Sequence, residues 1–156
     1  MEKRRIVCGV LLAAVLALAA WMLWPRSLGE VFDPAFPLSA AVTRDSFHIE
    51  GDFTVQDTET VSCTVKPGSP EMEAVCEILG RYRCHLCLDS LTGETVIQDV
   101  GDVGVRIRDQ EGRELWVSSA KSGKIFLNHR VVRAGYWGGA KGAALCKELA
   151  AVLSSA

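Results

Sequence analysis

The fold is decided by VGVRIRDQEGRELWVSSAKSGKIFL, residues 103–127. Apolar and polar side chains alternate in three short runs, which is typical of strands with one buried face and one wet face. The runs are separated by Asp109–Gly112 and Lys121–Gly123, and both separators are rich in residues that form turns. This stretch therefore predicts a meander of three antiparallel strands, one in each run.

The same alternation extends on both sides of the meander. It predicts earlier strands that include residues 47–49, 53–55 and 61–65, and a later strand at residues 131–137. A turn is expected at Glu50–Asp52, between the first two of them.

Two helices are expected between and after these strands. Ser69 can cap the first helix, at residues 69–80, and Pro70 suits its first turn. Its apolar stripe consists of Met72, Val75, Cys76 and Leu79. The stripe of the second helix, at residues 140–153, consists of Leu145, Leu149, Val152 and Leu153. The order of elements predicts an α+β fold in which an antiparallel β-sheet carries both amphipathic helices on one face.

The N-terminus predicts a transmembrane anchor at residues 6–24, a run without charge that is long enough to cross a bilayer as a helix. Lys3, Arg4 and Arg5 precede this run, so the positive-inside rule leaves residues 1–5 in the cytoplasm and places the rest of the chain beyond the cell membrane. A cleaved signal peptide is the alternative, because Ala17–Ala19 has the small-x-small form of a cleavage site. The apolar run continues past Ala19, which favours an uncleaved, single-pass anchor with the lipid bilayer as its partner.

The remaining chain is long enough for one domain. Residues 25–45, with three prolines, predict a linker, and residues 46–156 predict one extracytoplasmic α+β domain. Residues 27–156 carry 13 Lys and Arg against 18 Asp and Glu. An acidic domain argues against a nucleic-acid partner, and also against a domain that lies flat on an anionic membrane surface.

Cys84-His-Leu-Cys87 is the sharpest chemical motif in the chain. A Cys-x-x-Cys pair can cycle between dithiol and disulfide, so a thiol–disulfide oxidoreductase that uses Cys84 and Cys87 is one candidate function. Redox motifs of this kind open a helix, however, whereas alternation over residues 82–88 predicts a strand, which would point the two thiols to opposite faces. A structural role for the pair is therefore favoured.

A zinc site is a further candidate, because Cys84 and Cys87 with Cys63 or His129 could make a tetrahedral set. The second, similarly spaced ligand pair of a zinc knuckle is missing from the sequence. We therefore expect no metal and no cofactor, and we interpret the remaining cysteines as small apolar core residues.

Residues 59–156 resemble small extracytoplasmic domains on membrane-anchored surface proteins and lipoproteins of Gram-positive bacteria. The residues that carry the resemblance are the helix at 69–80, the strands at 104–109 and 115–117, the Ser122–Phe126 turn and strand, and the closing helix. The resemblance implies no activity that could be transferred to this chain.

No acid–base pair assembles in the sequence, and a binding or scaffolding module for a protein at the membrane is the favoured function. Large aromatic side chains dominate interface energetics. The candidate contact residues are therefore Trp116, Phe126, Tyr136 and Trp137.

Overall fold

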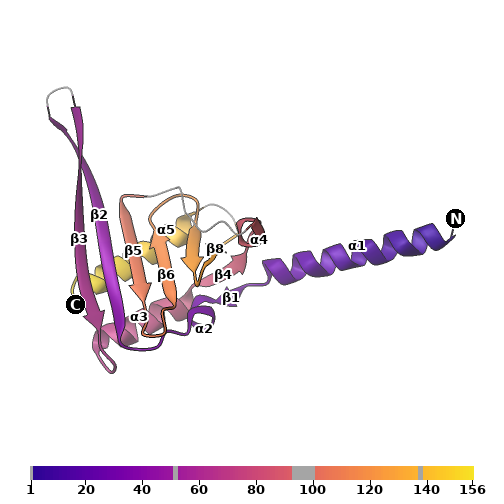
Figure 1. Cartoon of the computed structure of the whole chain (residues 1–156), viewed down its shortest axis with the longest axis horizontal. Helices are drawn as coiled ribbons and strands as arrows, with labels where there is room; N and C mark the ends of the chain where they lie inside the picture. Colours follow the sequence, from indigo (N-terminus) through magenta and orange to yellow (C-terminus); the bar gives the residue numbers. More distant parts are fainter. Residues whose placement is uncertain (1, 51–52, 93–100, 137–138) are drawn as a thin grey trace.

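The computed structural model describes residues 2–50, 53–92, 101–136 and 139–156, and its central element is one antiparallel sheet (Figure 1). The sheet has eight strands among these residues, in the order β1-β4-β8-β7-β6-β5-β2-β3. Their bounds are β1 Arg26–Ser27, β2 Leu38–Glu50, β3 Phe53–Val65, β4 Arg83–Leu86, β5 Val103–Arg108, β6 Glu114–Ser118, β7 Lys124–Leu127 and β8 Arg130–Ala134. The predicted α+β class with an antiparallel sheet is confirmed.

The meander forms as the alternation predicts. Val105 lies opposite Val117, and Val117 lies opposite Ile125, and all three side chains are fully buried. Opposed residues of antiparallel strands share a face. One face of β5, β6 and β7 therefore belongs to the core, and the alternate residues point away from it.

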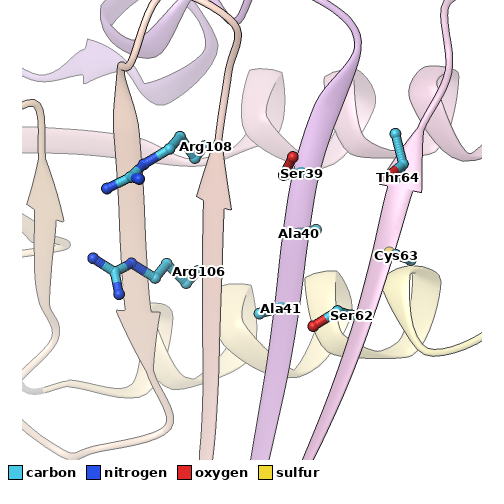
Figure 2. Close-up of a pocket in the computed structure, with 8 residues that line it drawn as sticks. All are labelled: Ser39, Ala40, Ala41, Ser62, Cys63, Thr64, Arg106 and Arg108. Atoms are coloured by element: carbon cyan, nitrogen blue, oxygen red, sulfur yellow. The ribbon is translucent and has the colours of Figure 1, made fainter.

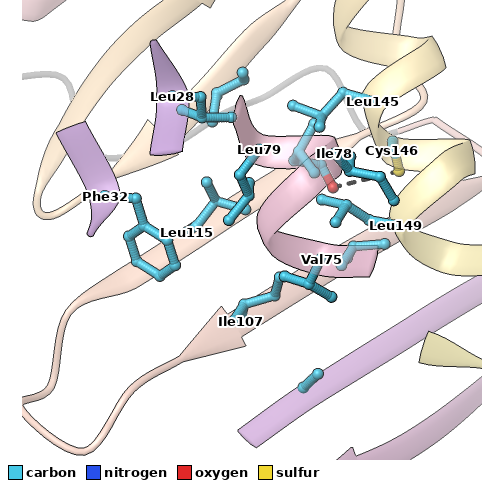
Figure 3. Packing of buried hydrophobic residues seen from close by; sticks show 14 of the residues in the cluster. Leu28, Phe32, Val75, Ile78, Leu79, Ile107, Leu115, Leu145, Cys146 and Leu149 are labelled. Atoms are coloured by element: carbon cyan, nitrogen blue, oxygen red, sulfur yellow. Dashed lines mark hydrogen bonds between the residues drawn. The ribbon is translucent and has the colours of Figure 1, made fainter. Parts of the chain in front are cut away.

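Two helices complete the core, α3 (Pro70–Arg81) and α5 (Ala140–Leu153). The Ser69 hydroxyl caps α3 by accepting a hydrogen bond from the Met72 amide at 3.2 Å. The two helices contact each other, and α5 also contacts β5 and β6. Figure 3 shows their leucine and isoleucine side chains pointing toward one another over Ile107 and Leu115 of the sheet.

The predicted stripe of the first helix needs one correction. Cys76 is exposed, and Ile78 is buried in its place beside Val75 and Leu79. Residues 75, 78 and 79 lie on one side of a helix. The buried side of α3 is therefore rotated from the predicted stripe, away from Cys76 and toward Ile78.

The linker predicted at residues 25–45 is wrong for most of its length. β1, the short helix α2 (Leu28–Phe32) and the first half of β2 all lie within this range. Leu28, Phe32 and Leu38 are fully buried, and the Leu28 amide donates a hydrogen bond to the Tyr82 carbonyl at 2.9 Å. The prolines suggested an extended linker, but the apolar residues between them contribute to the core, so the domain begins near Arg26.

The long strands β2 and β3 form a ribbon that extends beyond the rest of the sheet (Figure 1). They pair over 13 residues each, whereas β5 pairs with β2 only from Ser39 to Arg44. The strands expected near residues 47–49, 53–55 and 61–65 are parts of this ribbon. Of the turn expected at its tip, Gly51 and Asp52 lie outside the described residues.

The N-terminal helix α1 (Glu2–Leu23) projects away from the domain at the β1–β4 edge (Figure 1). Its segment Ile6–Leu23 is long and apolar enough to cross a membrane, and none of it is buried within the protein. A short helix, α4 (Asp89–Thr92), lies at the same end of the domain and contacts β8.

Candidate binding face

Side chains from five neighbouring strands line up on the side of the sheet that faces away from α3 and α5. The register places Ser62, Ala41, Arg106, Trp116 and Phe126 in one row across β3, β2, β5, β6 and β7. Trp116 and Phe126 are both half-buried. Two of the four predicted aromatic contact residues are therefore direct neighbours, with a guanidinium group on the strand beside them.

A shallow hollow adjoins this row where the side chains of β2 and β3 are small. Its volume is about 480 Å³. The residues that line it are Ser39, Ala40, Ala41, Ser62, Cys63, Thr64, Arg106 and Arg108. Figure 2 shows both arginine side chains rising from β5 and turning toward β6, so that their stems border the hollow. We call the row and this hollow together the open face.

One largely buried carboxylate positions both arginines. Glu114 accepts a hydrogen bond from Arg106 Nε, and its other oxygen lies 3.7 Å from Arg108 Nη2. The Glu114 side chain is 10% exposed, whereas those of Arg106 and Arg108 are 60% and 59% exposed. The hydrogen bond from Arg106 lowers the pKa of Glu114, and the positive charge of Arg108 acts in the same direction. Two guanidinium groups thus share one carboxylate and leave an excess positive charge on the open face.

Backbone contacts hold Glu114 in place. Its amide donates a hydrogen bond to the Asn128 side-chain oxygen at 3.0 Å, and its carbonyl accepts one from the Asn128 amide at 2.9 Å. Asn128 lies in the turn between β7 and β8, in the left-handed backbone region that asparagine tolerates. The backbone of Glu114 is therefore held by the turn that follows the neighbouring strand β7.

The open face offers binding chemistry. It combines two exposed cations, two aromatic rings and three hydroxyl groups, from Ser39, Ser62 and Thr64. Guanidinium groups recognise carboxylates through paired N–H donors, and the hydroxyls can donate or accept hydrogen bonds. The surface is thus suited to a polar partner that carries negative charge.

The two thiols of the Cys-x-x-Cys motif have different environments. Cys84 lies in β4 with its side chain in the core, 3% exposed, and burial raises its pKa to about 11. Cys87 follows the strand, and its sulfur lies 3.5 Å from the Ser90 hydroxyl. A redox-active thiol needs a lowered pKa. Burial of Cys84 acts in the opposite direction, and both cysteines are free.

The four residues considered for zinc do not come together. Cys63 is on β3 and Cys84 is on β4, six strand positions apart in the sheet. Neighbouring strands are about 4.8 Å apart, so these thiols are separated by roughly 29 Å. His129 is exposed in the turn between β7 and β8. Among the residues that the structure describes, no cluster of three or more His, Cys, Asp or Glu could hold a metal ion.

Tyr136, the third predicted contact residue, is not part of the row. It lies next to α1, where its hydroxyl donates a hydrogen bond to the Leu23 carbonyl at 2.5 Å. Its ring stacks on His85, with the ring centroids 4.7 Å apart. Trp137 lies outside the described residues.

Sequence reasoning missed the charged part of the open face. Alternation indicates that Arg106 and Arg108 face away from the core, but their shared partner Glu114 becomes visible only with the strand register. The hollow likewise depends on small residues of β2 and β3 lying beside β5. In comparisons with known proteins, no family model, no curated protein and no solved structure matches this chain.

Proposed function

We propose that this chain is a single-pass membrane protein whose α+β domain lies outside the cytoplasm and binds a partner protein through the open face. Helix α1 would anchor it through residues 6–24, with residues 1–5 in the cytoplasm. The length and apolar composition of α1 and the three basic residues before its apolar segment support this topology. The resemblance to extracytoplasmic domains of Gram-positive bacteria supports the same placement in the cell membrane.

The proposal depends above all on the row formed by Arg106, Trp116 and Phe126. Aromatic and arginine side chains contribute most of the energy at protein interfaces. Trp116 and Phe126 are held side by side on adjacent strands, and both are half-buried before binding. Little side-chain freedom would be lost when a partner covers them, which lowers the entropic cost of association.

The expected partner surface carries carboxylate groups. Among the described residues, Glu114 is the counterion that Arg106 and Arg108 share, and both arginine side chains are more than half exposed. A carboxylate from a partner could take the free N–H donors of either guanidinium group. The thiol–disulfide alternative is less well supported, because the buried Cys84 thiol has a raised pKa.

Site-specific photocrosslinking tests this function. A photoreactive phenylalanine analogue is introduced at Phe126 of the full chain in its native membrane, and the same analogue at Lys147, exposed on α5, serves as the control. We expect a discrete adduct from position 126 and none from position 147. Arg106→Glu should abolish that adduct, whereas Lys66→Glu, in the exposed loop after β3, should leave it unchanged.

An adduct that survives Arg106→Glu would show that the open-face charge is irrelevant to the partner. Equal labelling from positions 126 and 147, or no adduct from either, would show that the open face is not a binding surface.

A further inference from the structure

The last turns of α1 and the β4–α4 segment of the domain line one cavity of about 480 Å³. From α1 it is lined by Ala19, Met22 and Leu23, and from the domain by His85, Leu86, Cys87, Leu88, Asp89, Arg133 and Tyr136. The Tyr136 hydroxyl also donates a hydrogen bond to the Leu23 carbonyl. The end of α1 is thus in direct contact with one edge of the domain.

If α1 crosses a bilayer, this contact determines how close the edge of the domain lies to the hydrocarbon core. The apolar segment Ile6–Leu23 has 18 residues. It is about 27 Å long at 1.5 Å per residue, close to the thickness of a hydrocarbon core. The segment therefore needs its full length to cross, and Ala19–Leu23 must lie in or next to the hydrocarbon. Domain residues that share a cavity with Ala19 and Met22 lie at nearly the same depth.

Exposed apolar side chains of the domain lie at this edge. Among residues 25–46, 56–91, 101–136 and 139–156, for which side-chain exposure is described, the exposed large hydrophobic residues are Leu88, Leu91 and Tyr136, at 76%, 59% and 46%. Leu88 and Tyr136 line the cavity with α1, and Leu91 is one turn further along α4. Exposure of apolar side chains to water is unfavourable, and their transfer into a membrane interface is favourable.

Basic residues outnumber acidic residues at this edge. Residues 24–29, 81–88, 130–136 and 139–141, which form β1, β4, β8 and the start of α5, contain no Asp or Glu. Their basic residues are Arg26, Arg81, Arg83, Arg130, Arg133 and Lys141. The acidic residues beside them include Asp89 of α4, paired with Lys124 at 2.8 Å, and Glu148 of α5, paired with Arg81 at 2.8 Å. At the opposite edge, β2 and β3 carry four Asp and Glu residues against one Arg, Arg44, and no Lys.

Net charge alone argues against contact with an anionic membrane, but the fold separates the charges along the sheet. The basic edge is the one from which α1 leaves, and the acidic ribbon is at the other end (Figure 1). Basic residues near an anionic lipid surface are attracted to it, and the attraction falls off within a Debye length. Only the edge at α1 is close enough to benefit.

We propose that this membrane-proximal edge, defined by Leu88, Leu91 and Tyr136 with Arg83 and Lys141, is seated in the headgroup layer of an anionic bilayer. The inference rests on the proposed anchoring of the chain by α1. Its consequence is a fixed orientation of the domain. The strands run roughly along the membrane surface, β3 and its ribbon are farthest from the lipid, and the open face is turned sideways, accessible to a neighbouring protein.

The test uses the full chain reconstituted in phosphatidylcholine vesicles with or without phosphatidylglycerol. A genetically encoded, environment-sensitive fluorescent amino acid replaces Leu88 in one variant and Glu59, exposed on β3, in the other. We expect lipids spin-labelled near the headgroup to quench the probe at position 88 several-fold more than the probe at position 59. Arg83→Gln with Lys141→Gln should reduce this quenching in phosphatidylglycerol vesicles, and Lys66→Gln should not.

Carbonate extraction of the same vesicles separates the two levels of the proposal. If the protein resists extraction but the probes at positions 88 and 59 are quenched equally, the edge does not enter the lipid and this inference is overturned, while the anchor stands. If carbonate releases the protein, α1 is not an anchor, and both the inference and the proposed topology are overturned. Both probes replace exposed side chains, so neither substitution disturbs the core.

Discussion

Arg106 Nε donates a hydrogen bond to Glu114, although the residue directly opposite Glu114 in the strand register is Arg108. The closer contact is therefore the diagonal one, and Arg108 remains at 3.7 Å. Diagonal neighbours across antiparallel strands are within reach of long side chains. The arrangement leaves most of both guanidinium groups exposed, which makes the Glu114 carboxylate the fixed centre of the charged part of the open face.

Glu114→Gln should lower the free energy of unfolding by about 1 kcal/mol, because the hydrogen-bonded Arg106 and the nearby Arg108 lose a largely buried counterion. Arg108→Gln should change it by less than about 0.5 kcal/mol, since a mostly exposed ion pair contributes little. Urea denaturation of a fragment that begins at Pro25 measures both. Equal effects from the two substitutions would mean that Glu114 has no central role.

Asp109→Ala should lower the free energy of unfolding by about 2 kcal/mol, more than Glu114→Gln does. The Asp109 side chain is fully buried and accepts hydrogen bonds from the amides of Ala35, Glu111 and Arg113 and from Arg113 Nε at 2.6 Å. Without this carboxylate, several partly buried donors lose their acceptor. The matched control is Glu77→Gln on the exposed side of α3, which should be nearly neutral in the same denaturation experiment.

The Asp109 carboxyl should also make the stability of the folded protein depend on pH. Burial alone would raise the pKa of Asp109, but the hydrogen bonds from Ala35 and Arg113 outweigh it and lower the pKa in the folded protein. A lowered folded pKa stabilises the protein above the unfolded value of about 3.9, and this contribution is lost as the pH falls toward the folded pKa. The stability difference between the natural protein and Asp109→Asn should therefore shrink below about pH 4. A difference that grows with acid would contradict this sign.

The cysteines should differ sharply in reactivity at neutral pH. Cys76 is exposed, whereas burial raises the pKa of Cys84 to about 11 and that of Cys146 to about 12. We expect maleimide to modify Cys76 within minutes and the two buried thiols only after unfolding, as followed by mass spectrometry of tryptic peptides. Rapid modification of Cys84 in the folded protein would instead favour the thiol–disulfide function.

The exposed Cys76 also reports the topology of the chain. If α1 holds the domain outside the cytoplasm, a membrane-impermeant maleimide added to intact cells should label Cys76. Cys76→Ala is the control, and it should remove most of the signal. Labelling that requires permeabilised cells would place the domain in the cytoplasm and contradict the proposed orientation.

Local patterns in the sequence are sufficient for most of the secondary structure. The alternation at Val103–Ile107, at Leu115 and Val117, and at Ile125 and Leu127 identifies three neighbouring strands. Ser69 and Pro70 identify the start of α3, because a cap and an N-terminal proline act on the backbone of their own turn. The length and apolar composition of residues 6–24 likewise need no tertiary information.

The same local patterns misassign residues whose environment is set by distant parts of the chain. The prolines between residues 25 and 37 suggest a linker, yet Leu28 and Phe32 are buried because α3 and the sheet provide apolar surface for them. Cys76 has the spacing of a core residue and is exposed, since the orientation of α3 depends on where α5 packs.

The sequence by itself determined that the chain has an apolar N-terminal helix followed by one antiparallel α+β domain, because periodicity, caps and segment length act over a few residues. Only the tertiary structure decided that Arg106 shares Glu114 with Arg108, that Cys63 and Cys84 are at opposite ends of the sheet, and that the bases collect at the edge beside α1. These relationships depend on strand order and register, which join residues far apart in the chain. A binding face is such a relationship, and for that reason it became visible only in the folded molecule.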